Sequence, residues 1–441
     1  MSKNAALGKA RNAKQDEFYT QYEDIQRELN HYEKHFEGKT VFCNCDDPFE
    51  SNFCRFFLRN FNYLKLKRLI CTSYSSSPVL GAQLLLFDEM EEPVKKGIGY
   101  VMDITEPIAM ENGMGVSDFD INRLLKSEKR GVKKLKGDGD FRSEECIKYL
   151  KEADIVVTNP PFSLFREYMA QLMEYEKKFL IIGNQNAITY KEIFPLIKDN
   201  KVWLGCKSGD MAFRVPPYYE ERGTRFWIDE EGQKWRSLGT ICWFTNLEHK
   251  KRHEKLELYC HYYGNEEHYP KYDNYDAINV NKVAEIPLDY FERRGSNLLE
   301  NREQRTENRE QRTENREQRT ENSSVMGSWE CQLHSSTNTI QSNSKSLALT
   351  RGCQITQCQD IASPFEEKKP TLESSSRESC NGIMGVPLTF LDKYNPDQFV
   401  LLGITNTGEE NVGIRYKGTP HGRPVINGKE VYIRILIKYR L

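Results

Sequence analysis

The sequence predicts an α/β protein built on an open, largely parallel β-sheet with helices between the strands. Two short apolar runs, at 154–158 and 179–183, are typical of strands buried on both faces of a sheet. Each run ends in turn-forming residues, and the segment at 163–177 between them has the pattern of a helix. A strand, a helix and a second strand in this order predict the βαβ unit of a parallel sheet.

The composition is that of a folded protein of two or three domains. The chain has 441 residues, of which 38% are hydrophobic and 11% aromatic, enough for a sizeable core. The formal net charge is only −2, so any contact with nucleic acid must come from local basic clusters. The twelve cysteines form no C-x-x-C pair, and we expect buried reduced thiols rather than a zinc site. With no membrane-spanning apolar run and no signal-peptide pattern, we expect a cytoplasmic protein.

The first candidate for a ligand contact is Phe18-Tyr19-Thr20, which follows a basic segment rich in small residues. A charged amphipathic helix is predicted after it, from Tyr22 to Phe36. Phe18, Tyr19 and Thr20 could form a lip over a cofactor. They could equally well be aromatic packing where the helix begins.

The next candidate is an acidic turn that ends a predicted strand at 39–45. The turn contains Asn44, Asp46, Asp47 and Pro48, and a helix is predicted after it. The glycine-rich turn that cradles a pyrophosphate is missing here, which disfavours a dinucleotide. Carboxylates suit the sulfonium and ammonium groups of S-adenosylmethionine better. Ordinary capping of the following helix explains the same residues.

Basic residues gather between Lys126 and Lys136, after a second predicted strand at 66–72, and could contact phosphates or belong to a solvated loop. A glycine-bracketed acidic turn, with Asp138, Asp140 and Phe141, comes directly after them. This turn could contact the adenosine part of a cofactor. It could also merely cap the helix predicted at 143–151.

The residues that end the run at 154–158 suit one kind of chemistry. Asn159, Pro160, Pro161 and Phe162 follow the strand, and neither proline can continue it, because each lacks an N–H. The Asn159 side-chain oxygen and the Pro160 carbonyl can accept the two hydrogens of an exocyclic amine on a base. Accepting them frees the nitrogen lone pair for attack on a methyl donor, while Phe162 stacks on the flipped base. The plain alternative is a strand that ends in an ordinary turn.

Residues 207–239 mix lysine and arginine with aromatic residues, between predicted strands at 202–204 and 240–245. Such mixing is typical of surfaces that bind nucleic acid. Acidic residues balance the basic ones one for one in the same segment, as in a solvated loop. A DNA-contacting surface and a solvated loop therefore both stay open.

The composition changes sharply after Tyr290. The sequence Asn-Arg-Glu-Gln-Arg-Thr-Glu occurs three times in tandem at 301–321, and the repeat has no apolar position to form a coiled-coil seam. Residues 292–380 are rich in polar residues, which predicts a disordered, repeat-containing insertion. Ordered sequence resumes after it, and a terminal strand is predicted at 431–439. The residue types of the tyrosine-rich segment at 254–290, which precedes the insertion, identify no chemistry.

Seven short segments carry a resemblance that runs in order along nearly the whole chain outside 292–380. They lie at 18–20, 44–48, 137–142, 158–162, 243–246, 272–276 and 384–387. Together they resemble the motifs of the EcoRI-type adenine-specific DNA methyltransferase family. Asn-Pro-Pro-Phe recurs across amino-methyltransferases generally, whereas the acidic Asn-Cys-Asp-Asp-Pro turn looks more specific to this family.

The resemblance implies a Rossmann-like S-adenosylmethionine-dependent methyltransferase sheet with an additional smaller DNA-recognition region. The catalytic domain would cover 1–263, with 207–239 as a DNA-contacting excursion. Residues 264–291 and 381–441 would form the target-recognition region, with the insertion between them. Asn159 to Phe162 would form the base pocket, with Phe18, Asp46 and Asp138 near the cofactor.

The resemblance also implies the substrate, the exocyclic amine of adenine in double-stranded DNA, and a functional pairing with a restriction endonuclease or an orphan role. Two alternatives stay open on the sequence. The first is a methyltransferase for RNA or for a protein amide, since an amide offers a similar planar nitrogen. The second is a relative that binds DNA and has lost turnover.

We expect deletion of residues 296–378 to leave a folded protein, because the segment lacks the apolar residues needed to join a core. Thermal unfolding of the shortened chain should remain a single cooperative transition. Loss of that transition would show that the segment is structural.

Overall fold

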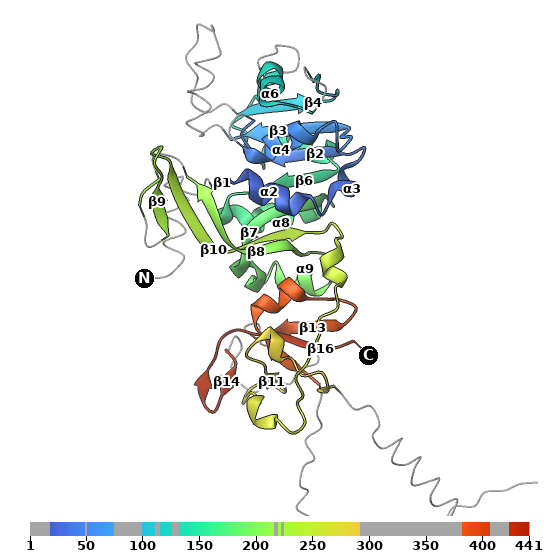
Figure 1. Cartoon of the computed structure of the whole chain (residues 1–441), viewed down its shortest axis with the longest axis vertical. Helices are drawn as coiled ribbons and strands as arrows, with labels where there is room; N and C mark the ends of the chain where they lie inside the picture. The colour runs from blue at the N-terminus through green and yellow to red at the C-terminus, as the bar shows by residue number, and fades with distance from the viewer. Residues whose placement is uncertain are drawn as a thin grey trace, which may run out of the picture. The chain divides into compact units, whose positions relative to one another are not determined.

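The computed structural model describes residues 18–48, 51–74, 99–110, 115–125, 132–215, 219–221, 225–291, 382–405 and 423–440. Within these residues, a ten-stranded mixed sheet runs in the order β1-β8-β10-β7-β6-β2-β3-β4-β5, with β9 paired to β10 (Figure 1). The predicted insertion at 292–380 lies outside the described residues. So do Lys126, Lys129 and Arg130 of the predicted basic cluster.

The bounds of these elements follow the predicted alternation of strands and helices. The strands are β1 (Tyr19–Thr20), β2 (Thr40–Asn44), β3 (Arg68–Ser73), β4 (Tyr100–Ile104), β5 (Val132–Lys134), β6 (Ile155–Thr158), β7 (Lys178–Asn184), β8 (Trp203–Arg214), β9 (Phe226–Ile228) and β10 (Lys234–Thr245). The helices are α2 (Tyr22–Leu29), α3 (Glu33–Phe36), α4 (Asn52–Asn60), α6 (Asp118–Leu125), α7 (Glu144–Glu152), α8 (Phe165–Glu174) and α9 (Phe194–Lys198). Among the described helices, none is long and apolar enough to cross a membrane.

The predicted strand before Asn159 is confirmed as a buried parallel strand. All four residues of β6 are buried, and β6 pairs in parallel with both β2 and β7. From β2 the chain continues outward to β3 on one side, and from β6 it continues to β7 on the other. The strand order therefore reverses between β2 and β6. In open α/β sheets, ligands bind outside the carboxyl ends of the strands at such a point.

The two strands that follow β7 are much longer than predicted. β8 and β10 have 12 residues each, and Ile241 pairs with Asn184 at the carboxyl end of β7. The halves of β8 and β10 beyond this pair continue past the edge of the sheet (Figure 1). We call residues 209–214 and 234–240, together with β1 and β9, the β arm. Residues 207–214, 226–228 and 234–239 of the 207–239 segment are therefore strand rather than loop.

The predicted helix from Tyr22 to Phe36 is broken into α2 and α3. The break falls at Asn30, His31 and Tyr32, three consecutive residues with poor helix propensity. The Tyr32 side chain is fully buried and donates its hydroxyl to Glu28, 3.0 Å away. Tertiary packing of Tyr32 thus takes the place of a continuous helix.

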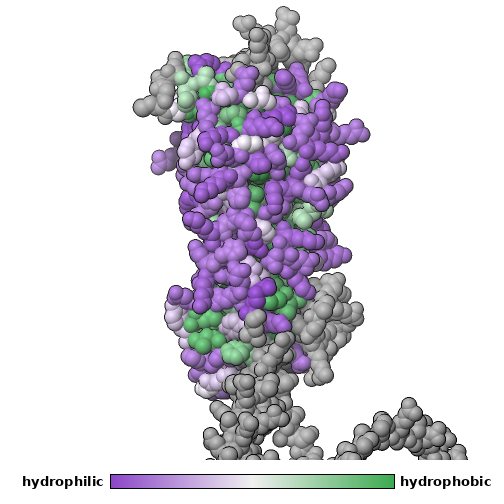
Figure 2. Space-filling view, turned by 90° about the vertical axis from the view of Figure 1, so that its right-hand side faces the viewer, coloured by the Kyte–Doolittle hydropathy of each residue, from purple (hydrophilic) through white to green (hydrophobic). Residues whose placement is uncertain are grey.

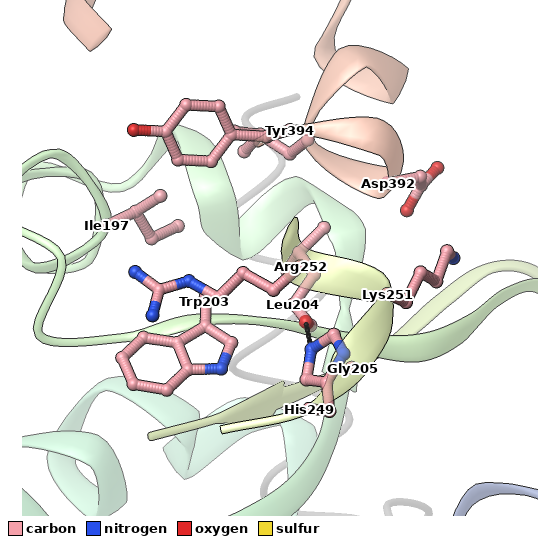
Figure 3. Close-up of a pocket in the computed structure, with 10 residues that line it drawn as sticks. Ile197, Trp203, Leu204, Gly205, His249, Lys251, Arg252, Asp392 and Tyr394 are labelled. Carbon is pink, nitrogen blue, oxygen red and sulfur yellow. Dashed lines mark hydrogen bonds between the residues drawn. The ribbon is translucent and has the colours of Figure 1, made fainter. Parts of the chain in front are cut away.

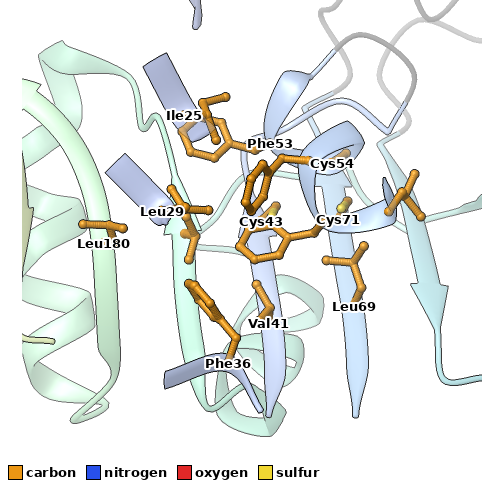
Figure 4. Packing of buried hydrophobic residues seen from close by; sticks show 14 of the residues in the cluster. Ile25, Leu29, Phe36, Val41, Cys43, Phe53, Cys54, Leu69, Cys71 and Leu180 are labelled. Carbon is orange, nitrogen blue, oxygen red and sulfur yellow. The ribbon is translucent and has the colours of Figure 1, made fainter. Parts of the chain in front are cut away.

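The main hydrophobic core lies between the strands and helices α2 and α4 (Figure 4). Phe36, Phe53 and Phe57 are almost completely buried there. Each such side chain contributes roughly 1.5–3 kcal/mol through burial. Cys43 and Cys71 belong to the same cluster, and six of the eight described cysteines are buried free thiols, as predicted. The face shown in Figure 2 is mainly hydrophilic, and apolar residues reach it in small separate groups.

The segments on either side of the insertion form one smaller sheet. Its strands are β11 (Ile278–Asn279), β12 (Met384–Val386), β16 (Ile435–Tyr439) and β13 (Phe399–Ile404), in that order. β11 and β12 pair in parallel, so this pairing joins residues that are about a hundred positions apart in sequence. The last strand begins at Ile435 rather than at the predicted Val431, because the Val431 N–H bonds the Pro424 carbonyl, 2.8 Å away, instead.

A small pocket lies between the start of β8 and the segment that precedes β13 (Figure 3). The Arg252 guanidinium lies over the Trp203 ring, 3.8 Å from its centroid, and donates to the Asn200 side chain at 2.9 Å. Asp392 and Tyr394 approach from the C-terminal segment. The pocket lies at the amino-terminal end of β8, so it is remote from the carboxyl ends of the strands.

A buried carboxylate fastens α2 to β8. Glu28 is fully buried and accepts the backbone N–H of Cys206 at 2.7 Å and that of Lys207 at 2.8 Å. A Cβ at Gly205 would lie 2.3 Å from a Glu28 oxygen, so only glycine fits there. Burial raises the pKa of Glu28 to about 7 despite these donors.

This pKa predicts how stability depends on pH. Between pH 4.5 and 7 the folded chain holds a proton on Glu28 that the unfolded chain has released. The contribution of Glu28 to the free energy of unfolding should therefore fall as pH rises, by an amount on the order of 3 kcal/mol.

Urea unfolding of the wild type and of Glu28→Gln at pH 5, 6, 7 and 8 checks this. The variant adds a penalty that is independent of pH, because its amide N–H₂ must face a backbone donor. The stability of the wild type relative to the variant should fall across the series. A difference that stays constant from pH 5 to pH 8 would contradict the prediction.

Candidate active site

A buried carboxylate ties together the turns that follow β2 and β6. Asp46 accepts the Ser51 hydroxyl at 2.7 Å and the Thr158 hydroxyl at 2.5 Å. Ser51 in turn caps α4 by accepting the Phe53 N–H at 3.1 Å. Burial raises the pKa of Asp46 well above its usual range. Both oxygens of this predicted cofactor ligand are thus engaged inside the protein.

The residues around Asp46 form a tight, buried turn. Cys45 has a φ of +69°, which is uncommon for a residue with a side chain and is found preferentially at functional sites. Asn44 is fully buried and accepts the Thr72 hydroxyl at 2.9 Å, so its side chain joins β2 to β3. Asp47 is also buried, and its carbonyl accepts the Ser51 N–H. Pro48, the last predicted residue of the turn, is buried as well.

Asn159 has a fixed orientation at the end of β6. Its amide nitrogen donates to the Phe18 carbonyl at 2.7 Å and lies 3.4 Å from the Thr20 hydroxyl. Because a carbonyl can only accept, the nitrogen must face Phe18 and the Asn159 oxygen must point the other way. That oxygen is buried and accepts no hydrogen bond from any described residue. A buried acceptor without a donor is costly unless a ligand supplies one.

The segment that orients Asn159 is itself anchored from α4. The Asn52 side chain donates to the Thr20 carbonyl at 2.7 Å. Thr20 also pairs with Phe213 of β8. Asn52 and Ser51 were not predicted as site residues. The sequence signal for Ser51 was its place as a helix cap after the acidic turn, whereas nothing local marks Asn52.

Aromatic rings surround the Asn159 corner. The rings of Phe18 and Phe162 stack with centroids 5.4 Å apart and an interplanar angle of 22°. Phe213 meets Phe18 edge-on at 5.6 Å and Phe162 at 6.4 Å. Tyr219 lies 6.1 Å from Phe18. The structure thus brings the predicted Phe18 and Phe162 together and adds two residues of the 207–239 segment.

The glycine-bracketed acidic turn lies against the end of β3. Gly139 has a φ of +80°, and a Cβ there would lie 2.0 Å from the Ser73 carbonyl oxygen. Asp140 forms an ion pair with Arg142 at 2.7 Å, which lowers the pKa of Asp140. Phe141 is buried against Tyr168. Asp138 accepts the Asp140 N–H at 3.0 Å and is half-buried.

Acidic residues in the β arm and directly beside it hold the arm together. Asp210 pairs with Arg225 at 3.1 Å, and Asp229 accepts the Trp235 indole N–H at 2.7 Å. The rings of Trp227 and Trp235 stack with centroids 6.1 Å apart. The balance of charges that indicated a solvated loop therefore includes carboxylates with structural partners. Tyr19 pairs with Arg214 at the end of β8, where the Arg214 guanidinium lies over the Tyr19 ring at 5.0 Å.

The comparisons with known proteins agree on one family. A model described as adenine-specific methyltransferase EcoRI matches residues 6–299 and 378–440. The type II methyltransferase M.EcoRI of Escherichia coli is 39% identical over 437 residues, which cover 99% of this chain and 96% of that protein. M.MpnI of Mycoplasma pneumoniae, also named a type II methyltransferase, is 37% identical over 66% of this chain and 79% of its own length. No solved structure matches the chain.

Two variants of Asp46 distinguish a structural role from a role as a charged ligand of the cofactor. Asp46→Asn keeps the shape and the ability to bond both hydroxyls, so unfolding stability and S-adenosylmethionine affinity should change little. Asp46→Ala removes the acceptor that Ser51 and Thr158 share and leaves Thr158 only the Asn44 carbonyl and Ser51 only the Phe53 N–H, which should cost about 1–3 kcal/mol of stability. Urea unfolding and calorimetric titration with S-adenosylmethionine check both variants. A large loss of affinity in Asp46→Asn with stability retained would assign a ligand charge to Asp46 instead.

Proposed function

Because the chain belongs to the adenine-specific methyltransferase EcoRI family and is a DNA adenine methyltransferase, we propose that Asn159 holds the reacting amine of a flipped adenine and that S-adenosylmethionine is the methyl donor. We place the reaction at the carboxyl ends of β2 and β6. The strand order around this point supports a Rossmann-like sheet, in which ligands bind where the order reverses.

One observation carries this proposal, the buried Asn159 oxygen that accepts no hydrogen bond from any described residue. The same amide has its nitrogen committed to Phe18, so the side chain cannot turn its donor toward a ligand. A ligand in this corner must therefore bring an N–H or O–H donor. The exocyclic amine of adenine brings two N–H donors on one planar nitrogen.

Asn159, Pro160 and Phe162 can prepare that amine for methylation. One N–H donates to the Asn159 oxygen, and the backbone carbonyl of Pro160 lies in sequence where it can accept the other. Both bonds draw the nitrogen towards tetrahedral geometry, so its lone pair is localised and can attack a methyl carbon. Phe162 offers its ring to stack on the base, which replaces part of the stacking lost on flipping. The proton leaves the nitrogen after the transfer, so no strong base is required.

The neighbouring turns fit a cationic cofactor that has no phosphate. S-adenosylmethionine, when bound, supplies a methyl group on a sulfonium. Asp47 and Asp138 place carboxylates at the ends of β2 and β3, and the rigid Cys45 turn brings backbone close to the site. We assign Phe18, Tyr19 and Pro48 to the walls of this site. Asn44, Asp46, Asp140 and Phe141 have protein partners, and we assign them to positioning the turns.

The β arm adjoins the base pocket and is our candidate for contact with the duplex beside the flipped base. Phe213 and Tyr219 of the 207–239 segment already contact Phe18 at the pocket. Trp227 is exposed on β9. We assign target recognition to 264–291 and 381–441. The names of the relatives, type II methyltransferases, support a role beside a restriction endonuclease.

The test is transfer of labelled methyl groups from S-adenosylmethionine to mixed-sequence duplex DNA, with RNA and protein in parallel. We expect N6-methylated adenine in DNA. Asn159→Ala should lower the rate of transfer at saturating substrates by a factor of about 10² or more, because it removes the acceptor for the amine. Its S-adenosylmethionine affinity should stay within a few-fold of the wild type.

Asn186→Ala is the matched control, because Asn186 follows β7 at the same edge of the sheet and its side chain is exposed. The control should keep wild-type turnover. An equal loss of cofactor affinity in Asn159→Ala would remove Asn159 from the base pocket. Label that appears in RNA or protein, and not in DNA, would overturn the substrate.

A further inference from the structure

A small two-stranded ribbon projects from the C-terminal sheet. It consists of β14 (Val425–Ile426) and β15 (Lys429–Glu430), joined by Asn427 and Gly428. The φ angles of these two residues are +50° and +72°, the values of a type I′ hairpin turn. A hairpin this short is not stable by itself in water. Contacts with the rest of the chain must therefore hold it in place.

Asp273 and Asn274 hold the ribbon through backbone groups. The Asp273 carboxylate accepts the Gly428 N–H at 2.8 Å, and its own N–H donates to the Val425 carbonyl at 2.8 Å. The Asn274 side chain accepts the Val425 N–H and donates to the Arg423 carbonyl, both at 2.9 Å. These bonds fix the backbone of the ribbon and involve none of its side chains.

One side of the ribbon packs against the protein, and its tip is exposed to solvent. Ile426 and Val431 pack against a small core built around Tyr272 and Tyr275. The four tip residues, 427–430, are all exposed. Tyr432 beside the ribbon has 82% of its side chain exposed, the largest fraction for any large apolar or aromatic residue that the structure describes.

The charges of this region are unlike those of the whole chain. Residues 423–440 contain five lysine and arginine residues and one glutamate, whereas the chain carries a formal net charge of −2. Arg423, Lys429 and Lys438 form no ion pair with any described carboxylate. By contrast, Arg68 and Arg142 each pair with two carboxylates. Cations without carboxylate partners are available to phosphates.

We propose that this ribbon enters the major groove of duplex DNA and contributes to the choice of the target sequence. The inference rests on the proposed function, since it requires DNA as the substrate. The major groove admits a two-stranded ribbon, and asparagine and lysine are side chains that bond the base edges of adenine and guanine there. Asn427 and Lys429 at the tip read base edges, while Arg423 and Lys438 contact phosphates.

The test compares a full-length double variant with two control variants. Asn427→Gly combined with Lys429→Gln removes both tip groups and keeps a residue that tolerates positive φ. The controls are Lys65→Gln and Tyr259→Ala, because both residues are exposed and lie outside the ribbon. Methyl transfer to mixed-sequence duplex DNA is measured, and every methylated adenine is mapped with its flanking bases.

We expect the double variant to raise KM for DNA roughly tenfold or more and to methylate adenines in a wider set of sequences. Its turnover at saturating DNA and its S-adenosylmethionine affinity should match the wild type, as should all properties of the controls. An unchanged KM and an unchanged set of sequences would overturn the role of the ribbon and leave the proposed function standing. A wild-type chain that transfers no methyl group to DNA would overturn the proposed function, and the role of the ribbon with it.

Discussion

The candidate site depends on one buried group, the carboxyl of Asp46. It bonds the Thr158 hydroxyl at the end of β6 and the Ser51 hydroxyl at the start of α4, so two turns and a helix share a single anchor. Because this carboxyl is buried, it would destabilise the folded protein unless both hydrogen bonds were made. Asn159 directly follows Thr158, so the same anchor sets the position of Asn159. The acidic turn thus acts first through hydrogen bonds and only secondarily through charge.

From that anchor, the site is closed by elements that come from distant parts of the chain. α4 holds the Thr20 carbonyl through Asn52, and the Phe18 carbonyl orients the Asn159 amide. β8 brings Phe213 against both Phe18 and Phe162. The β arm exists because β8 and β10 remain paired beyond the end of β7. This arrangement keeps the Asn159 oxygen buried and without a hydrogen bond from any described residue.

The turns with the strongest local chemistry were predictable, and the elements defined by pairing were not. Asn159-Pro160-Pro161 stops a strand because proline lacks an N–H, and the structure places this stop at the carboxyl end of a buried parallel strand. The length of β8 and β10 was missed, because residues 209–214 and 234–240 are only partly buried and show no continuous apolar pattern. Tyr272-Asp273-Asn274-Tyr275-Asp276 showed no chemistry because its partners lie about 150 residues away in the ribbon.

The sequence by itself determined the kinds of groups at the site. It predicted an amide and a stacking ring after one strand, carboxylates after another, and the family to which these motifs point. Those features follow from turn chemistry and residue type, which act over a few neighbouring positions. Only the tertiary structure decided which of these groups have hydrogen-bond partners within the protein. Asp46 and Asn159 looked equivalent as polar residues at strand ends. Packing gave Asp46 two hydroxyl partners and left the Asn159 oxygen without a donor, because hydrogen-bond satisfaction depends on which distant segments fold against each group.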